Sequence, residues 1–184
     1  MIHCTLLSPA IDVSYVVSEP FIDQTLTDLA ISVTPAGKGL NVASVVRELG
    51  EDVTLHAIIP EIDLLRYTRF LDERNIRHTI LPVPGSVRVN TTVLNVATNA
   101  VTHLNSAGAA VSLRFQDEFI EKISQSCNTG SYWCFSGSIP EGFDNDVYSR
   151  IIKTCNERGA HTLLDSRGAP LRLGLRTRPE MVKP

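Results

Sequence analysis

The stretch Thr-Pro-Ala-Gly-Lys-Gly-Leu-Asn-Val-Ala, residues 34–43, sets two glycines around a lysine directly before a segment with helical periodicity. Glycines at such a turn let a ligand approach the backbone, and the free N–H groups and dipole of a first helical turn favour an anion or a hydroxyl oxygen. Lys38 adds a charge-assisted donor, and Asn41 adds both a donor and an acceptor. The stretch therefore predicts a turn that binds an oxygen-rich ligand. A glycine turn that only allows tight packing is the alternative.

The best-known phosphate-binding motifs do not fit this stretch. No Ser or Thr follows Lys38 and the GxxxxGK spacing is absent, so it is not a Walker A loop. The GxGxxG fingerprint of dinucleotide-binding folds is absent as well. The meaning of the turn therefore depends on the rest of the chain.

Apolar runs rich in β-branched residues alternate with helix-period segments along the whole chain, which is typical of a parallel sheet covered by helices. We expect strands at Ile2–Leu7, Ile11–Val17, Ala30–Val33, Asp52–Ile59, His78–Val83, Arg88–Val96, Tyr132–Phe135 and His161–Leu164, with one more beginning within Arg178–Lys183. We expect helices at Leu40–Leu49, Ile62–Asn75, from Ser112 to near Cys127, and at Asn145–Arg158. The polar segment Glu19–Asp28 predicts an excursion from the core sheet, such as a flap or lid.

Composition limits the class of protein. The chain has 184 residues, of which 43% are hydrophobic, enough to bury one core, so residues 1–184 are expected to form a single domain. A net charge of −3, with 17 basic and 20 acidic residues spread along the chain, offers no basic stripe and argues against a nucleic-acid partner. No apolar run approaches the roughly 20 residues of a membrane span. No basic leader follows Met1, so we expect a cytoplasmic protein without a membrane partner.

The residues that commonly bind metals are scattered. Cys4, Cys127, Cys134 and Cys155 form no CxxC pair and no metal-ligand spacing with histidine, so neither a zinc site nor a disulfide framework is expected, and the thiols are expected to be reduced. The five histidines show no i, i+4 pair and no partnered nucleophile. We assign no metal site and no catalytic histidine.

Several short motifs, taken in order, resemble the phosphofructokinase B family of ribokinase-like carbohydrate kinases. The nearest branch is that of 1-phosphofructokinase and tagatose-6-phosphate kinase. The motifs are Thr5–Asp12, Ala36–Ala43, Arg88–Asn90, Leu104–Asn105, Ser136–Gly142 and Leu164–Gly168. Individually they are moderately specific, but their ordered set spans the chain from Met1 to Pro184.

The resemblance implies an α/β fold, namely a three-layer αβα sandwich with a small β-sheet lid. The lid would correspond to approximately residues 13–35, and the C-terminal portion of the fold would be missing. Family members transfer the γ-phosphoryl group of ATP, with Mg²⁺, to a hydroxyl of a sugar or sugar phosphate. The lid often mediates dimerisation, so we expect a homodimer or higher oligomer, formed through the lid or an exposed sheet edge.

The resemblance also implies roles for single residues on the sugar side. Asp12 would hold sugar hydroxyls at the end of the first strand, although a lone Asp after a strand is otherwise a turn or cap residue. Gly37, Lys38 and Asn41 would grip the sugar where the helix begins.

Arg88 would reach the phosphate of the sugar, because its planar fork donates two parallel hydrogen bonds. The alternative for Arg88 is a solvated charge on a strand. Ser138 would line the phosphosugar site, and simple turn chemistry is its alternative.

On the nucleotide side, Asp165 and Lys183 match positions that approach ATP in the family. The family pattern places an Asn, an acidic residue, a glycine-rich anion hole and the proton-accepting Asp after the position of Pro184. We therefore assign no catalytic residue within the chain. Phosphoryl transfer depends mainly on positioning and charge stabilisation, so the chain alone is expected to be inactive.

The chain departs from the family pattern at three places. Leu26–Thr27 replaces an Asn-Arg pair of the lid, Pro60–Glu61 replaces a Gly-Gly pair, and residues 105–109 replace Asn-Glu-x-Gly-Pro. Pro60 has a fixed φ and no N–H, so a close backbone approach is not expected there. These changes predict altered substrate choice or weakened function.

Three functional hypotheses follow. The first is a kinase-family protein that acts on a small sugar phosphate with ATP and Mg²⁺. The second is a non-catalytic phosphosugar-binding or degenerate family member. The third is a structural fragment that is stabilised by oligomerising, because an exposed sheet edge favours pairing between chains.

Overall fold

A six-stranded parallel sheet forms the centre of the protein, as seen in a computed structural model that describes residues 1–18, 23 and 25–184. Its strands follow the order β10-β9-β8-β1-β4-β5, and every neighbouring pair is parallel. Their bounds are β1 Ile2–Leu6, β4 Val53–Pro60, β5 Arg77–Val83, β8 Tyr132–Ser136, β9 His161–Asp165 and β10 Met181–Lys183. Parallel order places the carboxyl ends of these strands along one edge of the sheet.

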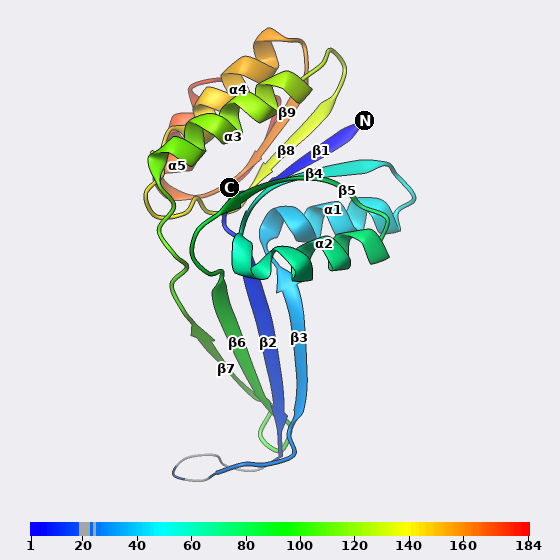
Figure 1. The fold of residues 1–184 in the computed structure, drawn as a ribbon, viewed down its shortest axis with the longest axis vertical. Coiled ribbons are helices and arrows are strands. Elements are labelled where there is room, and N and C mark those ends of the chain that lie inside the picture. Colours follow the sequence, from blue (N-terminus) through cyan, green and yellow to red (C-terminus); the bar gives the residue numbers. More distant parts are fainter. Residues whose placement is uncertain (19–22, 24) are drawn as a thin grey trace.

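Helices lie on both faces of this sheet and complete a three-layer sandwich (Figure 1). One face carries α1, Lys38–Glu48, and α2, Leu64–Glu73, the latter preceded by the 3₁₀ turn Glu61–Asp63. The other face carries α3, Leu113–Ser126, α4, Val147–Glu157, and α5, Gly168–Leu175. The ribokinase-like αβα architecture expected from the sequence is confirmed.

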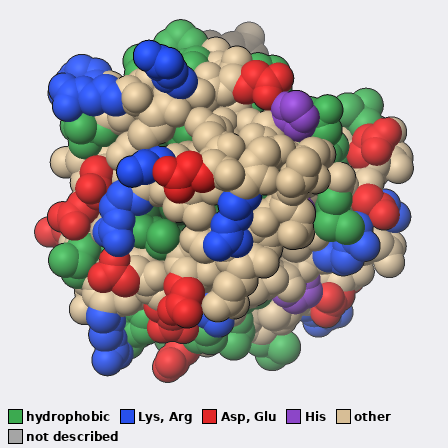
Figure 2. Space-filling view, turned by 90° about the horizontal axis from the view of Figure 1, so that it is seen from above, with side chains coloured by type: hydrophobic (Ala, Val, Ile, Leu, Met, Phe, Trp, Pro, Cys, Tyr) green, Lys and Arg blue, Asp and Glu red, His purple; other side chains and the backbone are tan. Residues whose placement is uncertain are grey.

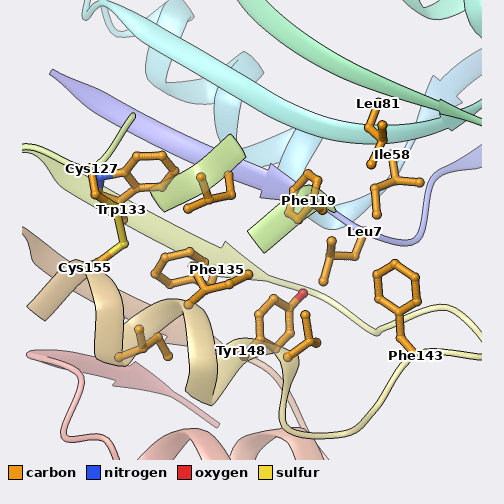
Figure 3. Packing of buried hydrophobic residues seen from close by; sticks show 14 of the residues in the cluster. Leu7, Ile58, Leu81, Phe119, Cys127, Trp133, Phe135, Phe143, Tyr148 and Cys155 are labelled. Atoms are coloured by element: carbon orange, nitrogen blue, oxygen red, sulfur yellow. A yellow bond between two sulfur atoms is a disulfide. The ribbon is translucent and has the colours of Figure 1, made fainter. Parts of the chain in front are cut away.

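The strands are apolar on both faces because each face is covered by helices. On β4, Leu55, Ala57 and Ile59 pack into the cluster beneath α1 and α2, whereas Ile58 packs into the opposite cluster. That second cluster gathers Trp133 and other aromatic side chains from β8, α3 and α4 (Figure 3). Two separate cores therefore hold the sheet between its helices.

The glycine turn before α1 is fixed by steric contact with β1. Gly37 has a φ of 135°, in the region that favours glycine. A Cβ built on Gly39 would lie 1.9 Å from the carbonyl oxygen of Thr5. Only a glycine lets the first turn of α1 lie this close to β1, so part of the motif has a packing role.

A second, four-stranded sheet projects from the carboxyl edge of the sandwich (Figure 1). Its order is β3-β2-β6-β7, with bounds β2 Ala10–Val17, β3 Ala30–Ala36, β6 Arg88–Asn95 and β7 Ala100–Asn105. The central pair β2 and β6 is parallel, and the two outer pairs are antiparallel. We call this sheet the lid. The lid was expected at approximately residues 13–35, but it also includes β6 and β7, which lie much later in the chain.

The two faces of the lid differ in character. Register places Asp12, Ser14 and Ser32 on one face, together with Asn90, Thr92 and His103. The opposite face carries Val13, Tyr15, Ile31, Val33, Val89 and Leu104. Because side chains alternate along a strand, the lid has one polar and one apolar face.

Most predicted elements are present, with boundary shifts of a few residues. The helix expected at Leu40 begins at Lys38, directly after the glycine turn. The strand at Ala100–Asn105 and the helix at Gly168–Leu175 were not predicted. The excursion predicted at Glu19–Asp28 lies partly outside the described residues.

The expectation of four reduced thiols is wrong for one pair. Cys127 follows α3 and Cys155 lies on α4, and their Sγ atoms are joined in a disulfide within the core, beside Trp133 (Figure 3). Their Cα atoms are 5.6 Å apart, which suits a disulfide. The pairing depends on α3 packing against α4, which the spacing of the cysteines in the sequence does not reveal. Cys4 and Cys134 are free thiols.

Candidate functional site

The carboxyl ends of β8 and β9 meet the start of α1 at a polar hollow of about 300 Å³. Ligands of open α/β sheets bind outside the carboxyl ends of the strands. The hollow is lined by Lys38, Arg88, Gly137, Ser138, Ser166, Arg167 and Pro184. Three cationic side chains and two hydroxyl groups thus surround one small space.

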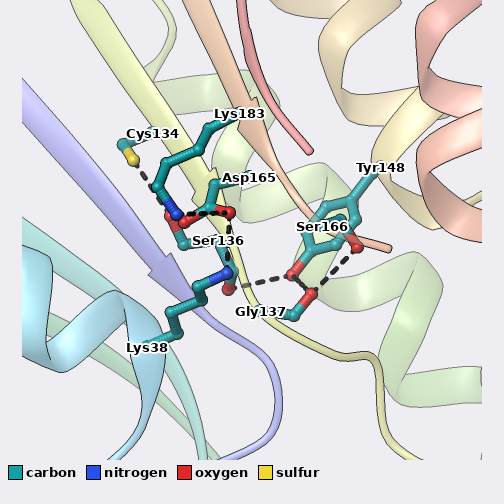
Figure 4. A network of polar contacts seen from close by, with 8 residues as sticks. All are labelled: Lys38, Cys134, Ser136, Gly137, Tyr148, Asp165, Ser166 and Lys183. Carbon is teal, nitrogen blue, oxygen red and sulfur yellow. Dashed lines mark hydrogen bonds and ion pairs between the residues drawn. The ribbon is translucent and has the colours of Figure 1, made fainter. Parts of the chain in front are cut away.

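The carboxylate of Asp165 lies beside this hollow, between two lysines (Figure 4). Lys38 Nζ is 2.6 Å from Asp165 Oδ1, and Lys183 Nζ is 3.7 Å from the same oxygen. The side chain of Asp165 is only 8% exposed, and a buried carboxylate needs such a partner. The family resemblance implies that Lys38 contacts the sugar and Asp165 the nucleotide, whereas the structure brings these two residues together.

The turn after β8 is held by hydrogen bonds to its backbone (Figure 4). Ser166 Oγ donates to the carbonyl of Gly137 at 3.1 Å, and the Gly137 N–H donates to the carbonyl of Asp165 at 2.9 Å. The hydroxyl of Tyr148 donates to the carbonyl of Ser136 at 3.1 Å. Burial raises the pKa of Tyr148, so its hydroxyl remains a donor. Ser138 is thereby presented from a rigid turn.

Arg88 enters the hollow from the other side, at the first residue of β6. Its Nε is buried and has no hydrogen-bond partner among the residues that the structure describes. A buried donor without a partner is destabilising, which makes an acceptor from a ligand favourable here. Arg88 also lines a second hollow, of about 230 Å³.

The second hollow is mainly apolar and adjoins the first through Arg88 and Ser138. Two of the departures from the family pattern contribute to it, namely Pro60 and the segment 106–109. The structure therefore places these departures next to the candidate site. The third departure, Leu26–Thr27, lies beyond β2 and does not line either hollow.

Asp12 lies on the same face of the lid as Arg88, because Ala10 pairs with Arg88 and Asp12 pairs with Asn90. Asn90 Nδ2 donates to Asp12 Oδ1 at 2.8 Å, a contact that sequence reasoning missed. Asp12 is exposed and lies on β2 two residues after Ala10, the residue that pairs with Arg88. It is outside the lining of the hollow. The structure thus brings Lys38, Arg88, Ser138 and Asp165 together, with Asp12 at a distance along the lid.

Two residues of the glycine turn do not line the hollow. Gly37 packs close to Leu6, since a Cβ at Gly37 would lie 2.5 Å from the Leu6 Cδ1. Asn41 is exposed on α1, and its N–H donates to the carbonyl of Gly37 at 2.9 Å. Arg167 does line the hollow, although the sequence analysis gave it no role. The available signal was a basic residue just after a buried strand.

Other kinds of site find little support in the described part of the chain. Residues 1–18, 23 and 25–184 contain no group of three or more His, Cys, Asp or Glu side chains that could hold a metal ion. No helix within those residues has the length and apolar character needed to cross a bilayer. On the face shown in Figure 2, Lys and Arg side chains are interspersed with Asp and Glu, without a large patch of one sign.

Comparison with known families assigns this architecture. The model of the pfkB family of carbohydrate kinases matches residues 5–183. The chain belongs to the pfkB family. The matched residues include all the ordered motifs from Thr5 to Gly168 on which the resemblance rests.

Solved structures show the same fold at low identity. Phosphofructokinase-2 from Escherichia coli, in complex with substrates and products, is 23% identical with a TM-score of 0.90, and the match covers 100% of this chain and 60% of that chain. A possible 1-phosphofructokinase from Thermotoga maritima is 20% identical with a TM-score of 0.87, covering 100% and 59%. Ribokinase from Giardia lamblia is 12% identical with a TM-score of 0.65, covering 91% and 56%. This pfkB chain thus spans about three fifths of the length of the proteins it matches.

Proposed function

We propose that this pfkB chain forms the sugar-phosphate-binding part of an ATP-dependent carbohydrate kinase. The observation that carries the proposal is the hollow into which Lys38 and Arg88 bring positive charge and Ser138 brings a hydroxyl. A phosphomonoester is a compact dianion whose oxygens accept hydrogen bonds from such groups. Arg88 is the strongest element, because its buried Nε is left without an acceptor among the described residues.

The polar face of the lid supports binding of the sugar itself. Asp12 accepts one hydrogen bond from Asn90 through Oδ1, which leaves Oδ2 to accept from a sugar hydroxyl. Because Asp12 and Arg88 share one face of the lid, a ligand whose phosphate contacts Arg88 can present hydroxyls toward Asp12. Gly37 and Asn41 would support the turn that carries Lys38.

The nucleotide side is represented by Asp165 and Lys183, which the resemblance assigns to ATP. The cationic and hydroxyl groups at the hollow fit phosphate oxygens. They do not fit Mg²⁺, since Asp165 is engaged by Lys38 and no other carboxylate lines this hollow among the described residues. Kinases of this family use ATP with Mg²⁺, but we assign no step through the metal to residues of this chain.

We further propose that the chain on its own binds a phosphosugar without transferring a phosphoryl group. A base that accepts the proton of the attacking hydroxyl must lie within hydrogen-bond reach of it. Of the described residues at the hollow, the candidate carboxylate is Asp165, and Lys38 holds it in an ion pair. This observation favours the non-catalytic binding member as the second candidate function.

Thermal unfolding with and without ligands tests the proposal. Fructose 1-phosphate, fructose 6-phosphate and tagatose 6-phosphate are each titrated into the chain, alone and with Mg-ATP. A ligand at one hundred times its Kd stabilises the folded state by about 2.7 kcal/mol, which raises Tm by several degrees. We expect a rise with at least one sugar phosphate, and its loss in Arg88→Gln but not in Arg69→Gln, since Arg69 is a surface residue paired with Glu73. The absence of any rise for the wild-type chain would refute phosphosugar binding.

We also propose that the apolar face of the lid is covered by a second copy of the chain. Ile31, Val33 and Leu104 are 55%, 50% and 60% exposed on that face, which favours association. Val33→Glu is expected to shift the chain from dimer to monomer in sedimentation velocity at micromolar concentration. Ser32→Glu, on the opposite face of the same strand, is the control and should leave the dimer intact. A wild-type chain that sediments as a monomer at the same concentration would contradict this assembly.

A further inference from the structure

Arg167 is a cationic residue of the hollow to which neither the sequence motifs nor the ion pairs assign a role. It follows β9 and has an extended backbone, with φ −141° and ψ 166°, directly before α5 begins at Gly168. Its side chain is exposed and lines the same hollow as Lys38, Arg88 and Ser138. Within residues 1–18, 23 and 25–184, no carboxylate forms an ion pair with it.

The balance of charge around the hollow favours a dianion. Lys38 shares the carboxylate of Asp165 with Lys183, at 2.6 Å and 3.7 Å, so its positive charge is partly compensated. Among the described residues, no carboxylate pairs with Arg88 or Arg167, so two uncompensated guanidinium groups line one hollow of about 300 Å³. Repulsion between them is relieved best by a group that carries two negative charges, and a phosphomonoester carries between one and two at neutral pH.

The backbone around Arg167 is uncrowded on one side and anchored on the other. Gly168 has a φ of 64°, and a Cβ built on it would meet no described atom within 4 Å. Ser166 also lines the hollow and is fixed by its hydrogen bond to the carbonyl of Gly137. Arg167 therefore extends from an anchored backbone at the sandwich, whereas Arg88 extends from the lid.

We propose that Arg167 binds the phosphate of the sugar ligand, as the partner of Arg88, and that it selects phosphorylated over unphosphorylated sugars. This inference rests on the proposed function and adds a residue that determines specificity. Arginine suits the role because its fork donates two parallel hydrogen bonds to phosphate oxygens, which lysine cannot reproduce.

The test compares Arg167→Gln with Arg172→Gln in calorimetric titrations with fructose 1-phosphate, fructose 6-phosphate, fructose and inorganic phosphate. Arg172 is exposed on α5, five residues after Arg167 and outside the lining of the hollow, so both variants lose one positive charge from the same region. We expect Arg167→Gln to lower the affinity for the phosphorylated sugars about tenfold or more and to leave the affinity for fructose unchanged. Arg167→Lys should recover part of the loss, and Arg172→Gln should behave as the wild type.

The outcomes separate this inference from the function on which it rests. Suppose that the wild type binds a sugar phosphate and that Arg167→Gln and Arg172→Gln bind it with equal affinity. This result would leave the proposed function intact but overturn the role of Arg167. An equal loss for fructose and for its phosphates would also overturn it, since the contact would then not involve phosphate. If the wild type binds none of the sugars, the proposed function fails. In that case, the affinities of the wild type and of Arg167→Gln for inorganic phosphate decide whether the hollow binds an anion. Equal affinities would refute the anion site as well.

Discussion

Gly39→Ala is expected to destabilise the chain strongly. The added Cβ would lie 1.9 Å from the carbonyl oxygen of Thr5, which belongs to the central strand β1 and cannot rotate away. Inserting one methyl group into a packed core costs about 1–3 kcal/mol when side chains can adjust, and more when the neighbour is backbone. We expect a loss on the order of 3 kcal/mol or more, a large fraction of the stability of a typical domain. Urea unfolding followed by circular dichroism measures it.

Gly130→Ala is the matched control for this substitution. Gly130 has a φ of 75°, but a Cβ built there would meet nothing within 4 Å. Its cost is therefore limited to the backbone strain of a left-handed residue, roughly 1–2 kcal/mol. If Gly39→Ala unfolds at the same urea concentration as Gly130→Ala, α1 does not lie against β1 as described.

Acid is expected to destabilise the chain through two buried histidines. His3 on β1 and His56 on β4 are 7% and 3% exposed, and His3 Nδ1 lies 3.0 Å from His56 Nε2. Burial, with smaller contributions from the N-terminal charge and Arg77, lowers the pKa of His3 to about 4. Burial, with the charge of His3, lowers the pKa of His56 to about 3. One nitrogen of this pair must accept the hydrogen bond, so full protonation would break it.

The sign of the effect follows from proton binding. Well above pH 6.5, the ordinary pKa of histidine, both histidines are neutral in the folded and the unfolded chain, so they do not make stability depend on pH. As the pH falls through 6.5 toward 4, the unfolded chain binds protons that the folded chain excludes, and the free energy of unfolding decreases. Each unit of pKa difference is worth about 1.4 kcal/mol, so the full shift corresponds to a loss of roughly 3 to 5 kcal/mol for each histidine.

Urea unfolding at intervals between pH 7 and pH 5 measures this slope, above the range where most carboxylates titrate. His56→Gln should make the slope shallower, whatever it does to stability at pH 7. His103→Gln, at an exposed position on β7, should leave the slope unchanged. A wild-type slope as shallow as that of His56→Gln would show that the pair is not buried in its neutral form.

The order of strands and helices could be predicted because the pattern of this sequence is locally consistent. On β4, Leu55, Ala57 and Ile58 are all buried, as expected for a strand covered on both faces. The glycine turn before α1 also followed from residue types and spacing. These features depend on neighbours within a few residues, which a sequence shows directly.

Features that depend on distant contacts could not be predicted. All residues of β7 are exposed, so its sequence carries little of the hydrophobic alternation that marks a strand. Helix α5 contains Gly174, which weakens the helical pattern, but a Cβ there would lie 2.4 Å from the Leu164 Cδ2. The contact between Lys38 and Asp165 joins residues 127 positions apart, and only the parallel order of the sheet brings them together.

The base of the lid is anchored to the sandwich by one side chain. The hydroxyl of Tyr67, on α2, lies within hydrogen-bonding distance of the carbonyls of Ala10 and Ala36, where β2 and β3 leave the sandwich. Beyond that anchor, β2 is paired with both β3 and β6, so the four strands form one hydrogen-bonded unit. Arg88 belongs to this unit, whereas Arg167 belongs to the sandwich. A ligand that contacts both side chains would therefore form a bridge between the two sheets.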